Sequence, residues 1–257
     1  MYTRLIRMLL LCCICSSSRG QLNESDSLRL QGKAALTGNI QRGNVDLLLV
    51  RSRLEFTVVP FRHFVFKSQN SSLYQEFSGR KADYDLFSRN YLYYQPKHII
   101  YPFAISYLSS NFRRKVSSRF FAGAGITVQV LRRPGHSIKI SGSTVYEESR
   151  FRGNQFNVIR YSGSNRISVW RSTTYIAGSH QFFNRRLRLN YDAYWQPVWG
   201  YAVNNRTQLD LGLEFPFWKG LSGTIQYSAT REAVGLNGVR KTDRILSFGV
   251  NYAYSRR

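Results

Sequence analysis

Apolar and polar side chains alternate strictly from Arg186 to Tyr254. Successive side chains of a strand point to opposite faces, so the alternation predicts strands with one apolar and one polar face. Each run is about ten residues long, which is the length of a tilted strand that crosses a bilayer. The apolar face of this segment includes Leu187, Leu189, Leu209, Leu211, Leu213 and Phe248. The pattern indicates a β-barrel that turns these side chains outward to lipid.

The N-terminus has the composition of a secretory signal peptide. Arg4 and Arg7 precede the apolar run Met8–Cys15, and small polar residues lead to Gly20. We expect cleavage after Gly20. Cleavage of the signal peptide, residues 1–20, would remove the three cysteines of the chain, at positions 12, 13 and 15. The mature chain would then have neither disulfides nor thiolate metal ligands. No linker interrupts residues 21–257, which predicts a single barrel domain.

Twelve segments of the mature chain have the pattern of strands. They are Leu28–Thr37, Val45–Val59, Phe64–Phe77, Asp83–Gln95, Phe103–Asn111, Arg119–Leu131, Ser137–Ser149, Arg166–Ala177, Arg186–Gln196, Thr207–Phe217, Leu221–Thr230 and Arg244–Tyr254.

The links between these segments alternate in length. Links after even-numbered strands are mostly short, and those after odd-numbered strands are mostly longer, including Ser78–Ala82, Arg150–Asn165, Pro197–Arg206 and Arg231–Asp243. Bacterial outer-membrane barrels have short periplasmic turns and long external loops. We therefore predict an all-β fold, a transmembrane antiparallel up-and-down β-barrel of about twelve strands. It would lie in the outer membrane of a Gram-negative bacterium, with both termini in the periplasm.

Two strands of this set are irregular. Ser52 interrupts the apolar face of Val45–Val59, and Arg166–Ala177 has no clear apolar face.

Charged residues on the polar faces must point into the lumen, because a charge on the lipid face costs about 2–4 kcal/mol at mid-bilayer. The lumen-lining candidates are Arg29, Lys33, Arg51, Arg53, Glu55, Lys139, Glu147, Arg186, Arg188, Asp192, Asp210 and Glu214. One interpretation is that they pair with one another and fill a narrow interior, as in small barrels. The other is that they line a narrow pore that favours anions.

Aromatic residues are abundant, and many lie near the ends of the predicted strands. Such residues form girdles at the two membrane interfaces. The predicted girdle residues are Tyr91, Tyr93, Tyr94, Tyr101, Phe103, Trp195, Trp199, Tyr201, Phe215, Phe217, Trp218, Tyr252 and Tyr254.

The chain is strongly basic, with a formal charge of +23 that falls to +20 when Arg4, Arg7 and Arg19 leave with the signal peptide. Such a charge predicts anionic partners. For an exported protein these are outer-membrane lipid and lipopolysaccharide phosphates, or anionic solutes. The export signal argues against nucleic acid. The loop Arg150–Asn165 is the best external basic patch, and its candidates are Arg150, Arg152 and Arg160.

No catalytic constellation is recognisable. The four histidines, His63, His98, His136 and His180, all fall in predicted periplasmic turns, whereas barrel enzymes work at the outer rim. Their scatter offers no metal-ligand spacing, and no cofactor is expected. The sequence thus favours a non-enzymatic barrel, either structural or a narrow pore with a basic lumen. Two alternatives stay open: an outer-membrane enzyme acting on lipid or peptide, and a soluble periplasmic β-barrel that binds an anionic ligand.

Short motifs resemble a known family. Leu30–Asn39 with the following Gly43-Asn44, and Arg119–Leu131 with its Ala122–Gly125 centre, are similar to bacterial outer-membrane β-barrels of unknown function that include the salt-induced outer-membrane protein. The resemblance implies an outer-membrane barrel without an established activity, and it supplies no catalytic residues.

Overall fold

Backbone hydrogen bonds join twelve antiparallel strands into a closed ring in this computed structural model, which describes residues 29–42 and 46–256. Each strand pairs with the next, and the last strand pairs with the first. The predicted signal peptide lies outside the described residues. The strands are β1 Leu30–Gln41, β2 Leu47–Phe61, β3 Phe64–Phe77, β4 Arg80–Tyr94, β5 Ile100–Asn111, β6 Val116–Arg133, β7 His136–Phe151, β8 Arg166–Phe182, β9 Leu187–Val198, β10 Tyr201–Pro216, β11 Leu221–Glu232 and β12 Thr242–Arg256.

The closed barrel confirms the predicted fold class and strand number. A single turn of 3-10 helix, η1 (Ile159–Tyr161), lies between β7 and β8. No helix in the described part of the chain is long and apolar enough to cross a membrane.

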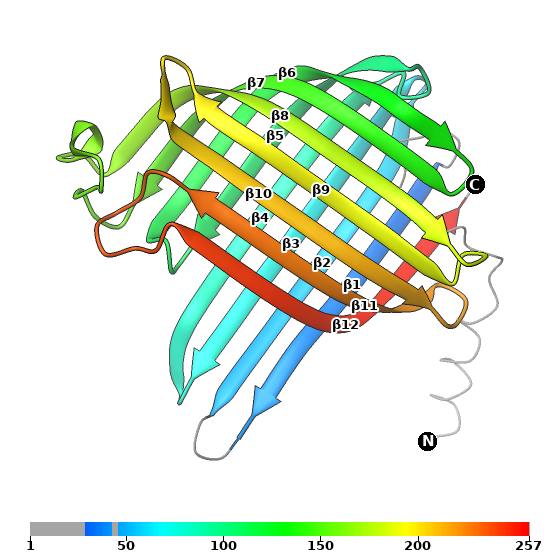
Figure 1. Ribbon diagram of the computed structural model, residues 1–257, viewed down its shortest axis with the longest axis horizontal. Coiled ribbons are helices and arrows are strands. Elements are labelled where there is room, and N and C mark those ends of the chain that lie inside the picture. Colours follow the sequence, from blue (N-terminus) through cyan, green and yellow to red (C-terminus); the bar gives the residue numbers. More distant parts are fainter. Residues whose placement is uncertain (1–28, 43–45, 257) are drawn as a thin grey trace.

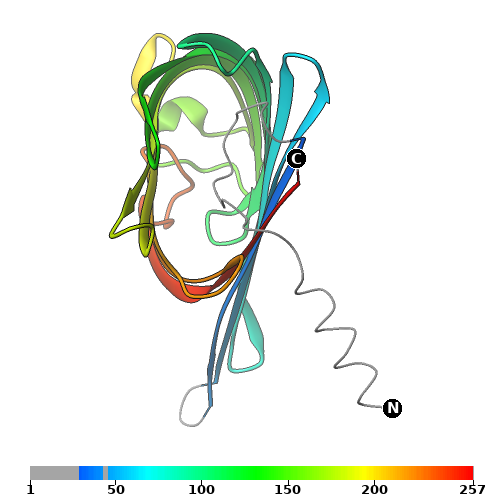
Figure 2. The ribbon, with the colours of Figure 1, turned by 90° about the vertical axis from the view of Figure 1, so that its right-hand side faces the viewer.

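The connections gather at two ends of the barrel. We call the end with the connections after even-numbered strands the turn end, and the opposite end the loop end. In Figure 1 the loops after β7 and β11 lie at the left, and the C-terminus lies at the right, at the turn end. Figure 2 shows that the barrel has a flat wall, which includes the blue and cyan strands β1–β4 and the C-terminal end of β12, and a curved wall, which includes the green, yellow and orange strands.

Two of the predicted long links are wrong. Ser78 and Gly79 alone connect β3 to β4, both with positive φ, so these strands form a tight hairpin. The predicted link Pro197–Arg206 is mostly strand, because β9 and β10 turn at Trp199–Gly200 and their register shifts between Tyr201 and Asn205. A bulge breaks the alternation and so hides a strand from pattern reading. The longest loops among the described residues are 152–165 and 233–241.

The barrel has the side-chain distribution of a protein that faces lipid. Leu36, Ile126, Leu246 and Phe248 are exposed on the outside, Phe248 to 60%. Charged residues on neighbouring inward positions, such as Arg171 and Glu147, are buried. A soluble barrel would have the reverse distribution.

Part of the predicted aromatic girdle is wrong. Tyr94, Trp195, Trp199, Phe215 and Tyr252 are exposed on the outer surface. In contrast, four predicted girdle residues point into the barrel and form a buried aromatic cluster: Tyr91, Tyr93, Tyr101 and Phe103. They occupy the positions of β4 and β5 that face the lumen, whereas their even-numbered neighbours face out.

Close packing between β6 and β7 requires glycine at position 123. A Cβ built there would lie 1.9 Å from the carbonyl oxygen of Thr144 and 2.7 Å from Cα of Val145. Both atoms belong to the backbone of β7, so neither can move without disturbing the sheet.

We predict that Gly123→Val lowers the free energy of unfolding by at least about 1–3 kcal/mol, which is the typical cost of overpacking a core. Gly142→Val on β7 is the matched control, because a Cβ at position 142 meets no atom within 4 Å. Equilibrium urea unfolding in lipid vesicles measures both. Equal stabilities for the two variants would contradict the packing argument.

Candidate functional site

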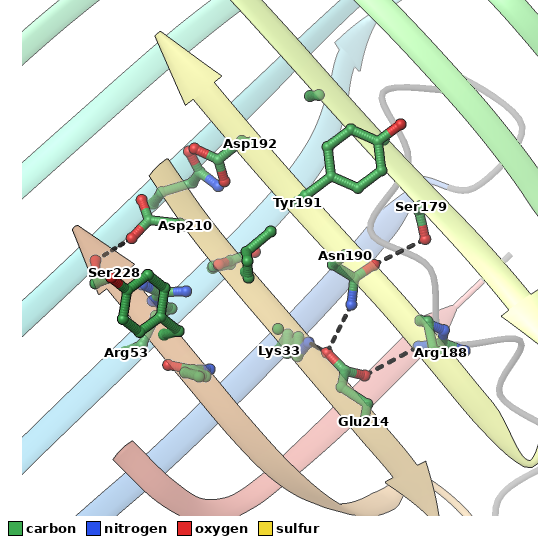
Figure 3. Close-up of a pocket in the computed structure, with 18 of the residues that line it drawn as sticks. Lys33, Arg53, Ser179, Arg188, Asn190, Tyr191, Asp192, Asp210, Glu214 and Ser228 are labelled. Atoms are coloured by element: carbon green, nitrogen blue, oxygen red, sulfur yellow. Dashed lines mark hydrogen bonds and ion pairs between the residues drawn. The ribbon is translucent and has the colours of Figure 1, made fainter. Parts of the chain in front are cut away.

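A charged cavity of about 190 Å³ occupies the turn-end part of the lumen. Its wall comes mainly from β1–β3 and β7–β11, and Figure 3 shows side chains from these strands converging on it. Six basic and four acidic side chains line it: Lys33, Arg51, Arg53, Lys67, Lys139 and Arg188, with Glu55, Asp192, Asp210 and Glu214. The cavity therefore carries an excess of positive charge.

Glu214 organises one side of this cavity. Its carboxylate pairs with Lys33 across the β1 side of the lumen, and it accepts hydrogen bonds from Arg188 Nη1 at 3.3 Å and Asn190 Nδ2 at 3.1 Å. These contacts are drawn in Figure 3. Strands β1, β9 and β10 thus share one polar network. In it, Glu214 fixes the positions of Lys33 and Arg188, whose positive charges would otherwise repel each other.

A second cavity of about 150 Å³ lies toward the loop end. Its basic and acidic residues include Arg113, Arg114, Asp85 and Asp243. The two cavities share Arg51, Arg53, Asp210 and Ser228 in their walls. We call these four residues the waist. The two cavities therefore adjoin at the waist, and we call them together the polar path. Eleven basic and seven acidic residues line the combined path.

The waist contains polar atoms that the protein leaves without hydrogen bonds. Asp210 accepts bonds from Gln208 and Ser228. In contrast, among the described residues, Nε of Arg53 and Oδ1 of neighbouring Asp192 have no hydrogen-bond partner. Because buried polar groups cost free energy unless they are hydrogen-bonded, these atoms favour water or a polar solute in the path.

A buried cluster of arginines and glutamates fills the lumen beside this path, on the side of β6–β8 and β10–β11. Glu147 on β7 accepts from Arg171 Nε at 2.9 Å, and from Arg206 Nη1 and Nη2 at 3.0 and 3.1 Å. Glu232 on β11 forms a bidentate pair with Arg119 on β6, at 2.7 and 2.9 Å. Arg171 lies on β8, next to β7, but the bonds from Arg206 on β10 to Glu147 and from Arg119 to Glu232 connect strands that are not neighbours, so they brace the barrel from inside.

Two loops cover this cluster and form a cap. Loop 152–165 and loop 233–241 join through a bridge between Phe156 and Leu236, and through the bond from Asn157 N to Gly235 O at 2.9 Å. Their apolar side chains pack on those at the ends of the strands in a buried cluster: Val116, Phe151, Phe156, Ile167, Val234 and Leu236. The cap closes the loop end over the β6–β8 side, and the path runs beside it.

Most of the predicted lumen residues lie on these walls. Nine line the turn-end cavity: Lys33, Arg51, Arg53, Glu55, Lys139, Arg188, Asp192, Asp210 and Glu214. Glu147 is the centre of the buried cluster. Arg29 and Arg186 are exceptions, because both are exposed beyond the strand ends, before β1 and in the turn after β8.

The three predicted basic loop candidates lie at the loop end and are exposed. Arg150 pairs with Glu148 at 3.2 Å, Arg152 stands over the ring of Phe112, and Arg160 stands 4.8 Å from the ring centre of Tyr201.

Several side chains of the lumen were missed by reading the sequence. Arg206 and Glu232 lie in segments predicted as loops, and Arg171 lies on the strand without a clear face. That strand, β8, carries Ser168, Ser172 and Thr174 outward and Ile167 inward beneath the cap, which erases the alternation. Arg89 was missed as well, because aromatic residues flank it in the sequence and the segment shows no recognisable charged face.

The histidines form no recognised catalytic arrangement. His136 and His180 face each other at the turn end, with Nδ1 atoms 3.2 Å apart, and His180 Nε2 lies 3.3 Å from the hydroxyl of Tyr191. Within residues 29–42 and 46–256, no group of three His, Cys, Asp or Glu side chains is arranged as a metal site.

Removing the central carboxylate of the buried cluster leaves three guanidinium groups without their shared anion. We therefore predict that Glu147→Gln lowers the free energy of unfolding by about 3–5 kcal/mol, as expected for a broken buried ion pair. The control is Glu148→Gln, one residue along, whose partners Arg150 and Arg166 are more than half exposed. We expect this control to leave the stability nearly unchanged, because exposed ion pairs contribute little. Urea unfolding in vesicles compares them; a Glu147 variant as stable as the control would refute the bracing role.

Solved structures with a similar fold are outer-membrane barrels. The NanC porin is 9% identical, with a TM-score of 0.50 over 86% of this chain and 98% of that chain. The translocator domain of autotransporter NalP from Neisseria meningitidis is 13% identical, with a TM-score of 0.46 over 98% and 97% of the two chains. No protein with curated annotation matches the sequence. A family model matches residues 34–254, and the chain therefore belongs to the family described as "Protein of unknown function, DUF481".

Proposed function

We propose that this protein is a non-enzymatic β-barrel of the bacterial outer membrane that conducts small anions along its basic lumen. The observation that supports this function is the pair of polar cavities that meet at the waist. Basic residues outnumber acidic ones along both cavities. A path walled by fixed charges of one excess sign favours counter-ions, here anions.

The rest of the molecule supports the membrane setting. The apolar outer face suits lipid, and the even strand number puts both termini on one side, which the short turns and the predicted signal peptide assign to the periplasm. The exposed arginines of the loop end then lie outside the cell, where lipopolysaccharide phosphates are their anionic partners. The conducted solutes would be small anions, because the path is narrow.

Conductance in planar bilayers tests the pore. We expect small single-channel steps and a reversal potential, in a chloride salt gradient, that indicates anion preference. Arg51→Gln with Arg53→Gln should reduce the preference, because each waist charge contributes about 1 kcal/mol, or about fivefold in ion occupancy, in water-like surroundings. Arg186→Gln is the control, since this arginine is exposed in a turn away from the path.

Two outcomes would contradict the proposal. A correctly folded protein without any conductance would eliminate the pore. An equal loss of anion preference in the Arg186 control would show that the net charge of the protein, rather than the waist, sets selectivity.

The cap narrows the loop end, so loosening it should raise the mean conductance. Phe156→Asp places a charge in the buried contact with Leu236 and is expected to separate the two loops. Ile159→Asp is the matched control in the same loop, because Ile159 is 92% exposed. Single-channel recordings compare them. Unchanged conductance in the Phe156 variant would mean that the cap does not limit the path.

A further inference from the structure

Uncharged polar side chains form a band on the outer face of β2–β5, where the barrel meets lipid. We call it the polar band; its members are Ser52, Ser68, Asn70, Ser72, Ser88, Asn90 and Ser106, of which Ser68 is buried and the others are partly or fully exposed. The strand registers pair them with one another: Ser52 is paired with Ser72, Asn70 with Ser88, and Asn90 with both Ser68 and Ser106. They share the even-numbered face with the exposed Leu54, Leu86, Leu92 and Leu108, whereas the odd-numbered Arg53 and Arg89 face the lumen.

The band lies at the middle of the strands. Asn70 is central in β3, and its partner Ser88 is near the centre of β4. Apolar residues flank the band on both sides, Leu86 and Leu108 toward the loop end and Phe66 and Leu92 toward the turn end. On β10 and β12, the corresponding middle positions carry Leu209, Leu211, Leu246 and Phe248. On β7 and β8 they carry Thr144, Ser172 and Thr174. The polar band differs from both regions in its two asparagine amides, Asn70 and Asn90.

Contacts within the band use only part of its hydrogen-bonding capacity. Asn70 Nδ2 donates to Ser68 Oγ at 2.9 Å, Asn90 Nδ2 donates to Ser88 Oγ at 3.3 Å, and the hydroxyls of Ser52 and Ser72 are 2.9 Å apart. An asparagine side chain offers two N–H donors and a carbonyl acceptor. Lipid tails can satisfy none of these groups, so polar residues at mid-membrane mark a contact with protein.

A second copy of this chain fits the band best. The band holds donors and acceptors together, so an identical band turned by a two-fold axis complements it. It contains no charge, so two copies of this basic protein do not repel each other there. Serine is small and lets two backbones approach closely. The strands of the band belong mainly to the flat wall in Figure 2, and two flat walls meet over several strands.

We propose that the polar band is the interface of a homodimer in the membrane, in which the amides of Asn70 and Asn90 hydrogen-bond to the band of the other protomer. The proposal rests on the barrel lying in a membrane, as proposed above, but not on conductance.

Disulfide cross-linking in lipid vesicles tests this interface, because residues 29–42 and 46–256 contain no cysteine. Ser88→Cys, near the centre of the band, should give a cross-linked dimer on oxidation. Leu211→Cys on the curved wall is the control and should stay mainly monomeric. Equal cross-linking of both variants would indicate random collision and overturn the proposal, as would no cross-linking of Ser88→Cys. A cross-link from position 88 to a different protein would also overturn it.

A second measurement separates interface loss from misfolding. The double variant Asn70→Leu with Asn90→Leu should keep the heat-modifiable gel shift of a folded barrel and float with vesicles, but change from dimer to monomer by mass measurement in nanodiscs. Leu209→Asn with Leu246→Asn, on the curved wall, should remain dimeric. A wild-type protein that floats with vesicles and is monomeric at every concentration refutes the dimer alone, whereas failure to float refutes the membrane barrel itself.

Discussion

Closure of the backbone hydrogen-bond ring is the constraint on which this structure depends. A strand edge has unpaired N–H and C=O groups, and lipid cannot satisfy them, so only a sheet that closes on itself can cross a membrane. Pairing of β12 with β1 removes the last edges. Once the ring is closed, each strand has one face outside and one inside. The outer face takes the apolar side chains, and the interior must accept the charges.

The interior is therefore held by ion pairs, beside the aromatic cluster of β4 and β5, where a soluble protein would have a continuous apolar core. The pairs are unevenly distributed. Glu147 and Glu232 gather arginines from several strands and fill one side of the lumen, beneath an apolar cap made of two loops. The turn-end cavity lies between β1–β3 and β7–β11, where the charges are less densely paired. The loop-end cavity borders the cluster itself, because Arg119, Arg206 and Glu232 line it.

The outer surface is also uneven. The C-terminal strands carry outward Leu, Phe and Tyr side chains as their alternation predicts, β8 carries serine and threonine, and β2–β5 carry serine and asparagine at their centre. The backbone hydrogen bonds are satisfied equally well in all of these strands. The difference between their outward side chains therefore concerns what lies next to the barrel. Ser52 is the one member of this band that the sequence pattern revealed, as an interruption in an apolar face.

The sequence by itself determined the class of the fold, because period-two alternation allows only one face of a strand to meet lipid. It also indicated the inward charges of regular strands, such as Lys33, Arg53 and Asp210, from their place on the polar face. It failed where local pattern was broken: at the bulge in β10, which hid Arg206, and in β8, where serines outside and Ile167 inside removed the alternation.

Only the tertiary structure decided which charges meet and which surfaces come together. Arg119 and Glu232 are 113 residues apart in sequence, and closure of the barrel brings them to a distance of 2.7 Å. Loops 152–165 and 233–241 combine into a cap for the same reason. The serines and asparagines of β2–β5 become a continuous band only when the registers of four strands align them. Alternation fixes the face of each residue, but strand register and ring closure fix its neighbours.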